Sequence, residues 1–208
     1  MAAIFFDLDG TLFDTRADLA ATVNHTRRDL GLSELSEKAV LAFVGCGARH
    51  LLDHAIPERK GEDVQALFRG RYAEHCCERL TPYPGVLETL AELNRRGHRL
   101  GVNTNKPGFA TRAILAKFGL SGLFGEAVVA GGDGFPLKPD PASIRACAAR
   151  MSHALSSEDW MVGDSWTDLR CAEAAGVKSA FCAFGFGSRA GAACTVCLDC
   201  FRDLLAAL

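Results

Sequence analysis

The sequence lacks the features that mark membrane and secreted proteins. None of its apolar runs reaches the roughly 20 residues that a helix needs to cross a bilayer. The apolar run at residues 2–6 is too short for a signal peptide, and the first charge after it is acidic. We therefore expect a cytoplasmic protein with no membrane partner.

The sequence also lacks an excess of basic residues. Lysine and arginine total 23, aspartate and glutamate total 25, and the formal net charge at pH 7 is −2. Proteins that bind nucleic acids usually carry a strong basic excess on one face. The charge balance therefore argues against a nucleic-acid partner. Hydrophobic residues make up 49% of the chain, which is enough for a real core.

The nine cysteines lack the even number and the rhythm of a disulfide scaffold. A chain of 208 residues does not need such a scaffold, so we expect reduced thiols. Cys194, Cys197 and Cys200 are each separated by two residues and form the one notable cluster. Zinc and iron–sulfur sites normally take four ligands, and no fourth ligand is evident nearby. We interpret the three as small apolar residues of a final strand.

Most of the chain alternates between short apolar strands and helices. Strands are predicted at residues 4–6, 99–103, 127–130, 160–163 and 179–183, and a last strand and helix precede residue 208. Helical patterns separate these strands from residue 81 onward. This alternation is typical of an α/β protein with a doubly wound parallel sheet.

Residues 15–81 show helical patterns and no strand. A helix is predicted to start at a cap formed by Thr15 and Asp18 and to end at Gly31. Shorter helices follow as far as Pro57, and a longer helix covers about 61–79. We therefore predict that residues 1–14 and 82–208 form an α/β core domain that carries residues 15–81 as a helical insert.

Two carboxylates follow the first predicted strand. Asp7 and Asp9 are two residues apart, so their side chains lie on the same side of an extended chain. A pair of ionised carboxylates is costly unless a cation or a shared proton relieves the repulsion. The pair is therefore a candidate for Mg²⁺ binding, for nucleophilic and acid catalysis, or for both. The alternative is an ordinary Asp–Gly turn after a strand.

Other polar residues follow the other predicted strands. In a doubly wound sheet the carboxyl ends of the strands share one edge, and ligands bind beyond it. That edge combines a hydroxyl, a cation and four carboxylates, which come from Thr104 with Asn105, Lys138, Asp7 with Asp9, and Asp164 with Asp168. Each residue alone has an ordinary explanation, such as a helix cap in the segment from Asp164 to Asp168 or a solvated lysine at Lys138.

Together these groups match the needs of phosphoryl transfer. A carboxylate can attack phosphorus to form an aspartyl-phosphate, and Mg²⁺ would offset the repulsion between the two anions. Lys138 and the Thr104 hydroxyl would neutralise and orient the phosphoryl oxygens. Asp9 would protonate the leaving oxygen and later deprotonate the attacking water.

The same residues occur in a familiar order. Asp7-Leu8-Asp9-Gly10-Thr11, Thr104-Asn105, Lys138-Pro139 and Gly163-Asp164-Ser165 with Asp168 resemble the four signature motifs of the haloacid dehalogenase (HAD) superfamily. The resemblance implies a Rossmann-like core with residues 15–81 as a small helical cap domain. It also implies that Asp7 is the nucleophile and Asp9 the general acid/base. Mg²⁺ would be held by Asp7, the backbone carbonyl of Asp9, and Asp164, and Asp168 would join through water or orient Lys138.

Within the superfamily, three segments resemble phosphoglycolate phosphatases: Thr104-Asn105-Lys106-Pro107, Leu137-Lys138-Pro139-Asp140-Pro141 and Gly45-Cys46-Gly47. The acid at Asp9 argues against the dehalogenase members, which carry none there. We therefore expect a Mg²⁺-dependent phosphatase for a small phosphorylated metabolite, with 2-phosphoglycolate favoured. A sugar-phosphate phosphatase or a β-phosphoglucomutase-like phosphotransferase is the alternative. A receiver-like signalling module or a non-catalytic phosphate-binding protein is favoured less.

The resemblance places the residues that select the substrate on the cap. Arg49, beside the glycine loop at 45–47, is predicted to grip a substrate carboxylate through two hydrogen bonds. Lys106 and Asn105 are predicted to contact the substrate from the core. The alternative for Arg49 is a solvent-facing side chain at a helix start. We expect the protein to be a monomer or a small homo-oligomer.

Overall fold

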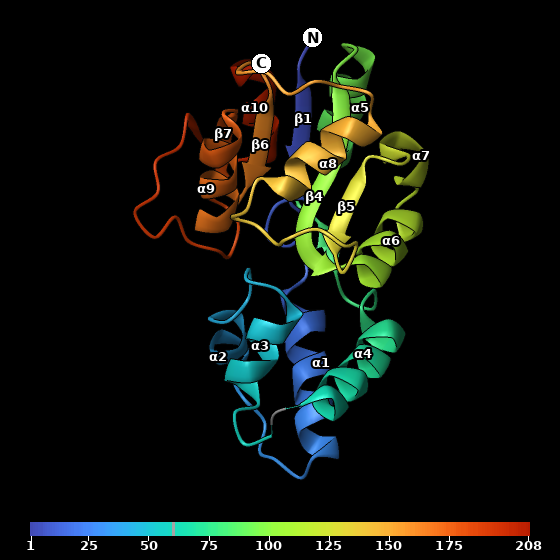
Figure 1. Cartoon of the computed structure of the whole chain (residues 1–208). Helices are drawn as coiled ribbons and strands as arrows, with labels where there is room; N and C mark the ends of the chain where they lie inside the picture. The colour runs from blue at the N-terminus through green and yellow to red at the C-terminus, as the bar shows by residue number, and fades with distance from the viewer. Residues whose placement is uncertain (60) are drawn as a thin grey trace.

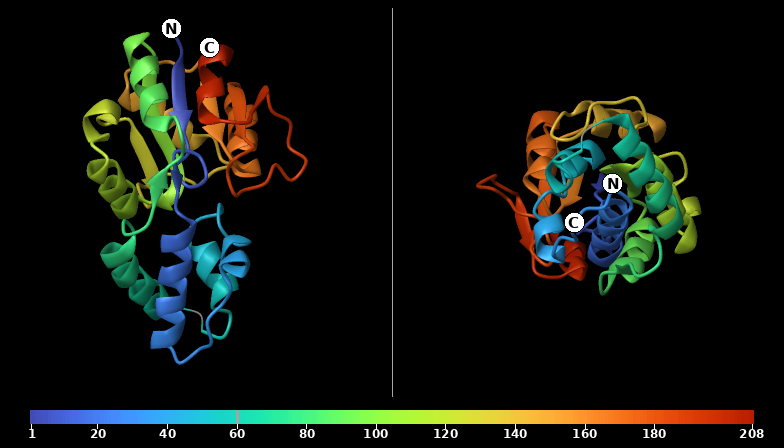
Figure 2. Two further views of the ribbon diagram at one scale, coloured as in Figure 1. Left: turned by 180° about the vertical axis from the view of Figure 1, so that it is seen from behind. Right: turned by 90° about the horizontal axis from the view of Figure 1, so that it is seen from below.

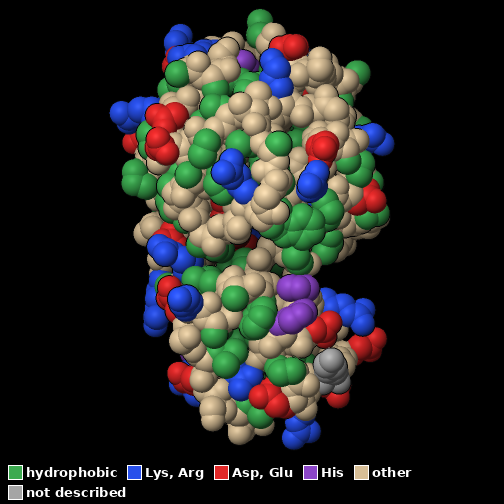
Figure 3. Space-filling view, turned by 90° about the vertical axis from the view of Figure 1, so that its left-hand side faces the viewer, with side chains coloured by type: hydrophobic (Ala, Val, Ile, Leu, Met, Phe, Trp, Pro, Cys, Tyr) green, Lys and Arg blue, Asp and Glu red, His purple; other side chains and the backbone are tan. Residues whose placement is uncertain are grey.

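The computed structural model describes residues 1–59 and 61–208 and consists of two lobes joined at a waist (Figure 1; Figure 3). The larger lobe contains a six-stranded sheet and both chain termini, which lie at the end farthest from the smaller lobe (Figure 1). The described residues of the smaller lobe form four helices: α1 (Arg16–Asp29), α2 (Glu37–Leu41), α3 (Ala48–Ala55) and α4 (Glu62–His75).

The sheet is parallel throughout, in the order β5-β4-β1-β6-β7-β8. Its strands are β1 (Ala3–Phe6), β4 (Arg99–Pro107), β5 (Val128–Gly131), β6 (Trp160–Gly163), β7 (Lys178–Cys182) and β8 (Val196–Leu198). The chain builds outward from β1 to β4 and β5, then returns to β6 and builds in the other direction. The predicted doubly wound α/β fold is confirmed, and its switch point lies between β1 and β6.

Both faces of the sheet are covered by helices, as Figure 2 shows from behind. Ala3 and Phe5 of β1 pack on one face with α8 (Ala142–Arg150) and α9 (Trp166–Ala175). Ile4 and Phe6 pack on the other face with α5, α6 and α7, and with the C-terminal turn. A strand that is buried on both faces is apolar at every position, which explains why β1 is a continuous run without alternation. The elements of the second face are α5 (Val86–Arg95), α6 (Gly108–Lys117), α7 (Ser121–Phe124), the 3₁₀ helix η1 (Phe201–Asp203) and α10 (Leu204–Ala207).

The four helices of the smaller lobe enclose a core of their own. Leu19 and Val23 of α1 pack against Leu51 of α3 and against Phe68 and Tyr72 of α4, and all five side chains are buried. Helical spacing places these apolar residues on one face of each helix, so the lobe closes by packing those faces together.

A short antiparallel ribbon joins the two lobes. It pairs β2 (Phe13–Asp14) with β3 (Thr81–Pro82), and Asp14 lies opposite Thr81. The sequence did not predict this ribbon, because two residues per strand are too few to show a period. Because the ribbon holds the two crossings of the chain side by side, we propose residues 15–81 as the cap domain and residues 1–14 and 82–208 as the core.

The structure also bears on two further predictions, one about membrane-spanning helices and one about the cysteine cluster. No helix among residues 1–59 and 61–208 is long and apolar enough to cross a membrane. The cysteine cluster is not a run of apolar strand residues: only Cys197 lies in β8, and both Cys197 and Cys200 are exposed. Cys200 instead precedes η1, where its thiol lies 3.2 Å from Asp203 Oδ1.

Candidate active site

Lys138 is buried among acidic side chains at the carboxyl edge of the sheet. Its Nζ lies 3.0 Å from Asp7 Oδ1 and donates to Asp168 Oδ1 at 2.6 Å and to the Asn103 carbonyl at 2.7 Å. Two of the ammonium hydrogens are therefore donated to Asp168 and Asn103, and Asp7 is an ion-pair partner of the same group. Burial alone would lower the pKa of Lys138, but Asp168 and Asp7 outweigh burial and raise it, so the side chain stays charged.

Asp7, Asp164 and Asp168 form a buried acidic cluster at the switch point. Each offers an oxygen that lies within 4.8 Å of the others. Burial and the charges of Asp168 and Asp7 raise the pKa of Asp164 well above its usual range. Asp7 Oδ1 is buried and accepts no hydrogen bond from the described residues, apart from its ion pair with Lys138. Crowded oxygen ligands with an unsatisfied atom fit a hard divalent cation such as Mg²⁺.

Asp164 sits in a pocket that only glycine backbone can form. Gly10 has a φ of +75°, and a Cβ atom on it would lie 1.8 Å from Asp164 Oδ2. The same oxygen accepts hydrogen bonds from the N–H groups of Phe186 at 3.0 Å and Gly187 at 2.7 Å. Sequence reasoning missed the loop at 185–187. Its position directly after a predicted strand was the available signal.

Asp168 both caps a helix and holds Lys138. Its Oδ2 accepts from the Ser165 N–H at 3.0 Å and from the Ser165 hydroxyl at 2.9 Å, at the start of α9. Its Oδ1 receives the Lys138 ammonium. The helix cap considered from the sequence is therefore present, and it fixes the carboxylate that orients Lys138.

Asn105, predicted to bind substrate, has its side-chain amide fully engaged within the protein. Its Oδ1 accepts from the Lys138 N–H at 2.8 Å, and its Nδ2 donates to the carbonyls of Lys138 and Gly45, both at 3.0 Å. The side chain therefore positions the Lys138 backbone and ties it to the smaller lobe. Thr104 is buried next to it and accepts from the Lys106 N–H at 3.2 Å.

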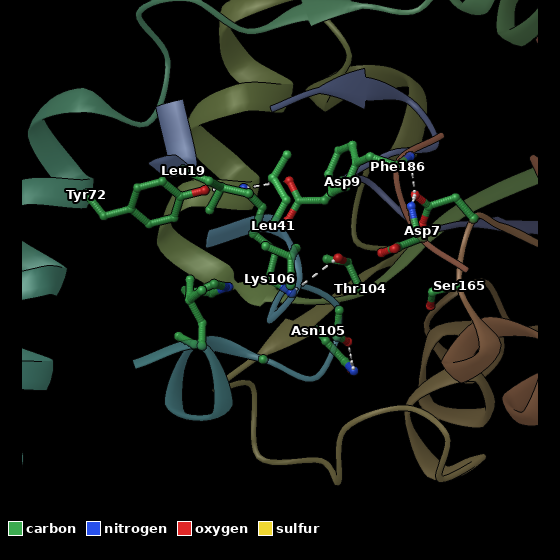
Figure 4. Close-up of a pocket in the computed structure, with 18 of the residues that line it drawn as sticks. Asp7, Asp9, Leu19, Leu41, Tyr72, Thr104, Asn105, Lys106, Ser165 and Phe186 are labelled. Atoms are coloured by element: carbon green, nitrogen blue, oxygen red, sulfur yellow. Dashed lines mark hydrogen bonds and ion pairs between the residues drawn. The ribbon is translucent and has the colours of Figure 1, made fainter. Parts of the chain in front are cut away.

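Asp9 lies apart from the acidic cluster, at the junction of the two lobes (Figure 4). Its Oδ1 accepts from the Thr15 hydroxyl and from Lys106 Nζ, both at 2.7 Å. The Lys106 ammonium also donates to the hydroxyl of Tyr72 on α4. Tyr72 was not among the residues predicted for the site, because its helical spacing indicates only a residue on one side of the helix. A buried tyrosine hydroxyl usually has a polar partner, and that general rule was the signal that pointed beyond packing.

A cavity of about 60 Å³ lies where these residues meet. The core contributes its polar wall, and the smaller lobe contributes an apolar one. Because one water needs at least roughly 10–15 Å³, the cavity holds only a few waters and suits a small ligand. The polar wall includes Asp7, Asp9, Thr104, Lys106 and Asp164, and the apolar wall includes Leu19, Leu41, Val44, Leu51 and Phe68.

Arg49 is not brought to this cavity. Its side chain is 82% exposed, and its Nε lies 3.9 Å from Asp53 Oδ2. Arg49 lines a separate groove between the lobes. The geometry matches the solvent-facing alternative that the sequence left open.

We expect Arg49→Ala to change the kcat/KM for the predicted substrate, 2-phosphoglycolate, less than about twofold, because the Arg49 side chain is exposed and lies outside the cavity. Steady-state release of inorganic phosphate measures the effect. A loss of tenfold or more would show that Arg49 reaches the substrate during turnover.

The fold and the site together define a class of protein. A doubly wound sheet carries an acidic cluster and a buried lysine at its switch point, and a helical lobe closes over them. The chain belongs to the haloacid dehalogenase-like hydrolases, whose family model matches residues 4–182. The resemblance drawn from the four motifs and the prediction of a hydrolytic enzyme are confirmed.

Similar proteins cover nearly the whole chain. A phosphoglycolate phosphatase of Mesorhizobium japonicum is 34% identical over 89% of this chain and 84% of its own length. A phosphoglycolate phosphatase of Cereibacter sphaeroides is 36% identical over 89% of this chain and 87% of its own length. The crystal structure of a predicted phosphoglycolate phosphatase from Haemophilus somnus matches with a TM-score of 0.92 at 31% identity, over 100% of this chain and 97% of that one.

Proposed function

We propose that this protein is a Mg²⁺-dependent phosphatase that hydrolyses a small phosphorylated metabolite, with 2-phosphoglycolate as its preferred substrate. The observation that carries the proposal is that Asp7 and Asp164 of the acidic cluster line a small cavity, while Lys138 lies buried against Asp7. The names of the relatives at 34% and 36% identity support the choice of substrate.

The acidic cluster is the proposed metal site. Asp7, Asp164 and the backbone carbonyl of Asp9 would hold Mg²⁺, which when bound would offset the repulsion between Asp7 and the phosphate dianion. Both oxygens of Asp168 already accept hydrogen bonds from Lys138 and Ser165. We therefore assign Asp168 the role of orienting Lys138, which is one of the two roles predicted for it.

The proposed reaction has two steps. A carboxylate oxygen of Asp7 attacks phosphorus, the bond from phosphorus to the ester oxygen breaks, and Asp9 gives that oxygen a proton. A water then attacks the aspartyl-phosphate, Asp9 takes a proton from it, and inorganic phosphate leaves as the Asp7 carboxylate re-forms. Lys138 and the Thr104 hydroxyl orient the phosphoryl oxygens in both steps.

The smaller lobe would act as the lid of this site. Its side chains form the apolar wall of the cavity, and such a wall excludes bulk water from the phosphoryl group. The small volume of the cavity supports a small metabolite over a nucleotide or a phosphoprotein.

A substrate panel with Mg²⁺ tests the proposal. We expect 2-phosphoglycolate to be hydrolysed with a kcat/KM at least about tenfold above that of sugar phosphates, nucleotides and pyrophosphate. Activity should disappear in excess chelator and return when Mg²⁺ is added, because Asp7 and the phosphate would otherwise repel each other.

Two outcomes would contradict parts of the proposal. Equal rates with and without chelator would refute the metal role. An isomerised sugar phosphate as product, with no inorganic phosphate released, would establish the phosphotransferase alternative instead.

A further inference from the structure

Two hydrogen-bond donors face the cavity without an acceptor for their last hydrogen. The Lys106 ammonium has three hydrogens, and the described residues accept two of them, at Asp9 Oδ1 and at the Tyr72 hydroxyl. Because the Tyr72 oxygen accepts that bond, its own proton remains to be donated, and no described residue accepts it. Both side chains are buried and both line the cavity.

It costs free energy to leave a buried donor of this kind without a hydrogen bond. Tyr72 is 1% exposed and Lys106 4% exposed, so bulk water does not solvate them. An unsatisfied buried donor costs roughly 1–3 kcal/mol, and more when it is charged. Burial raises the pKa of the Tyr72 phenol, which keeps its proton. Lys106 is paired with the Asp9 carboxylate at 2.7 Å, so it presents a cation to the cavity. The pair is ready to receive an anionic oxygen.

The position of the pair identifies which part of the substrate it faces. Asp9, the proposed acid for the leaving oxygen, accepts directly from Lys106, whereas Lys138 binds Asp7 on the other side of the site. Figure 4 shows the Tyr72 hydroxyl pointing from α4 toward Asp9, which lies between Tyr72 and the more distant Asp7 and Ser165. The two donors therefore lie beside the leaving group and not beside the phosphoryl group.

We propose that Tyr72 and Lys106 together bind a carboxylate on the leaving group, and that Tyr72 is a specificity-determining residue. This inference rests on the proposed phosphatase function and names the feature of the substrate that the site selects. Two donors match the two oxygens of a carboxylate. In 2-phosphoglycolate a single methylene separates the carboxylate from the ester oxygen, which suits a donor pair adjacent to Asp9.

The pair also spans the two lobes. Lys106 lies in β4 of the core, and Tyr72 lies in α4 of the smaller lobe. A carboxylate held by both donors is held by both lobes at once, so the substrate that fits the pair also favours the closed site. The Tyr72 ring is held by packing against Phe68 at a centroid distance of 5.2 Å and Phe109 at 6.1 Å, which fixes where the hydroxyl points.

The test compares Tyr72→Phe with the wild type on two substrates, 2-phosphoglycolate and ethyl phosphate, in which a methyl group replaces the carboxylate. We expect the wild type to prefer 2-phosphoglycolate. Tyr72→Phe should lower the kcat/KM for 2-phosphoglycolate at least about tenfold, mainly through KM, because it removes a hydrogen bond to a charged group. For ethyl phosphate the change should stay within about twofold.

Tyr83→Phe is the matched control. Tyr83 is the only other tyrosine of the chain, and it packs on Phe184 at 5.0 Å outside the cavity. Tyr83→Phe should leave the kcat/KM for both substrates unchanged. The ratio of the kcat/KM values for the two substrates, measured on one preparation, does not depend on the fraction of folded enzyme. A partly unfolded variant therefore still tests the proposal.

Each contrary result has its own meaning. An equal loss on both substrates, or no loss on either, would overturn the carboxylate assignment of Tyr72. If the wild type hydrolyses ethyl phosphate and 2-phosphoglycolate with equal kcat/KM, the carboxylate assignment is also overturned, while the phosphatase function stands. A wild type that hydrolyses no phosphate ester would overturn the proposed function and this inference with it.

Discussion

Asp7→Asn is expected to lower kcat at least about 10³-fold while the protein stays folded. The amide is nearly the same size as the carboxylate, but its oxygen carries no charge and is a poor nucleophile. Replacing one of three crowded buried carboxylates also removes repulsion, and Lys138 keeps its 2.6 Å partner Asp168. The melting temperature should therefore stay equal to that of the wild type or rise slightly.

Phosphate release at saturating substrate and a thermal melt measure the two effects. Asp53→Asn is the control, because Asp53 is a partly exposed carboxylate of the smaller lobe outside the cavity. In an acid-quenched wild-type reaction, the phosphorylated peptide should contain Asp7, and no such peptide should form in Asp7→Asn. If Asp7→Asn keeps a kcat within tenfold of the wild type, Asp7 is not the nucleophile.

Lys138→Met is expected to reduce both activity and stability. The ammonium is the partner of Asp7 and Asp168, and methionine fills similar space without a charge. Removing one partner of a buried ion pair leaves uncompensated charge and costs roughly 3–5 kcal/mol. The kcat should fall at least about 10²-fold, because the phosphoryl oxygens lose the cation that orients them.

Urea unfolding at neutral pH measures the loss of stability, and phosphate release measures the loss of activity. Lys178→Met is the matched control: its ion pair with Glu158, also at 2.6 Å, is on the surface. We expect that variant to lose at most about 1 kcal/mol. The double variant Lys138→Met with Asp168→Asn should regain stability but not activity, since it removes one of the unpaired charges. Equal stability of Lys138→Met and Lys178→Met would show that Lys138 does not compensate the cluster.

The residues that follow strands were predictable from the sequence. Asp7 and Asp164 come directly after β1 and β6, and Thr104 lies in the last half of β4; parallel strands bring their carboxyl ends to one edge. Lys138 lies in the loop after β5, and the same rule brought it to that edge. The contacts among them follow from the topology alone, which the alternation of strands and helices already indicated.

The residues that act across the two lobes were not predictable in this way. Tyr72 has the spacing of a helix core residue, and its contact with Lys106 depends on how the lobes close. Arg49 follows the glycine loop in sequence, yet the start of α3 turns its side chain to solvent. Asn105 was predictable as a polar residue near a strand end, but not the hydrogen bonds to Lys138 and Gly45 that occupy its whole amide. Contacts between distant segments are fixed by packing, which periodicity does not record.

The ribbon at the waist makes the protein modular. Because Asp14 and Thr81 are paired neighbours, the chain leaves the sheet and returns to it at nearly the same point. An inserted segment whose ends lie side by side can change in length and sequence without disturbing the domain that hosts it. A different insert on the same two strands would keep Asp7, Lys138 and Asp164 in place while presenting a new wall to the cavity. The core residues proposed for catalysis and the cap residues that line the cavity can therefore evolve, or be engineered, separately.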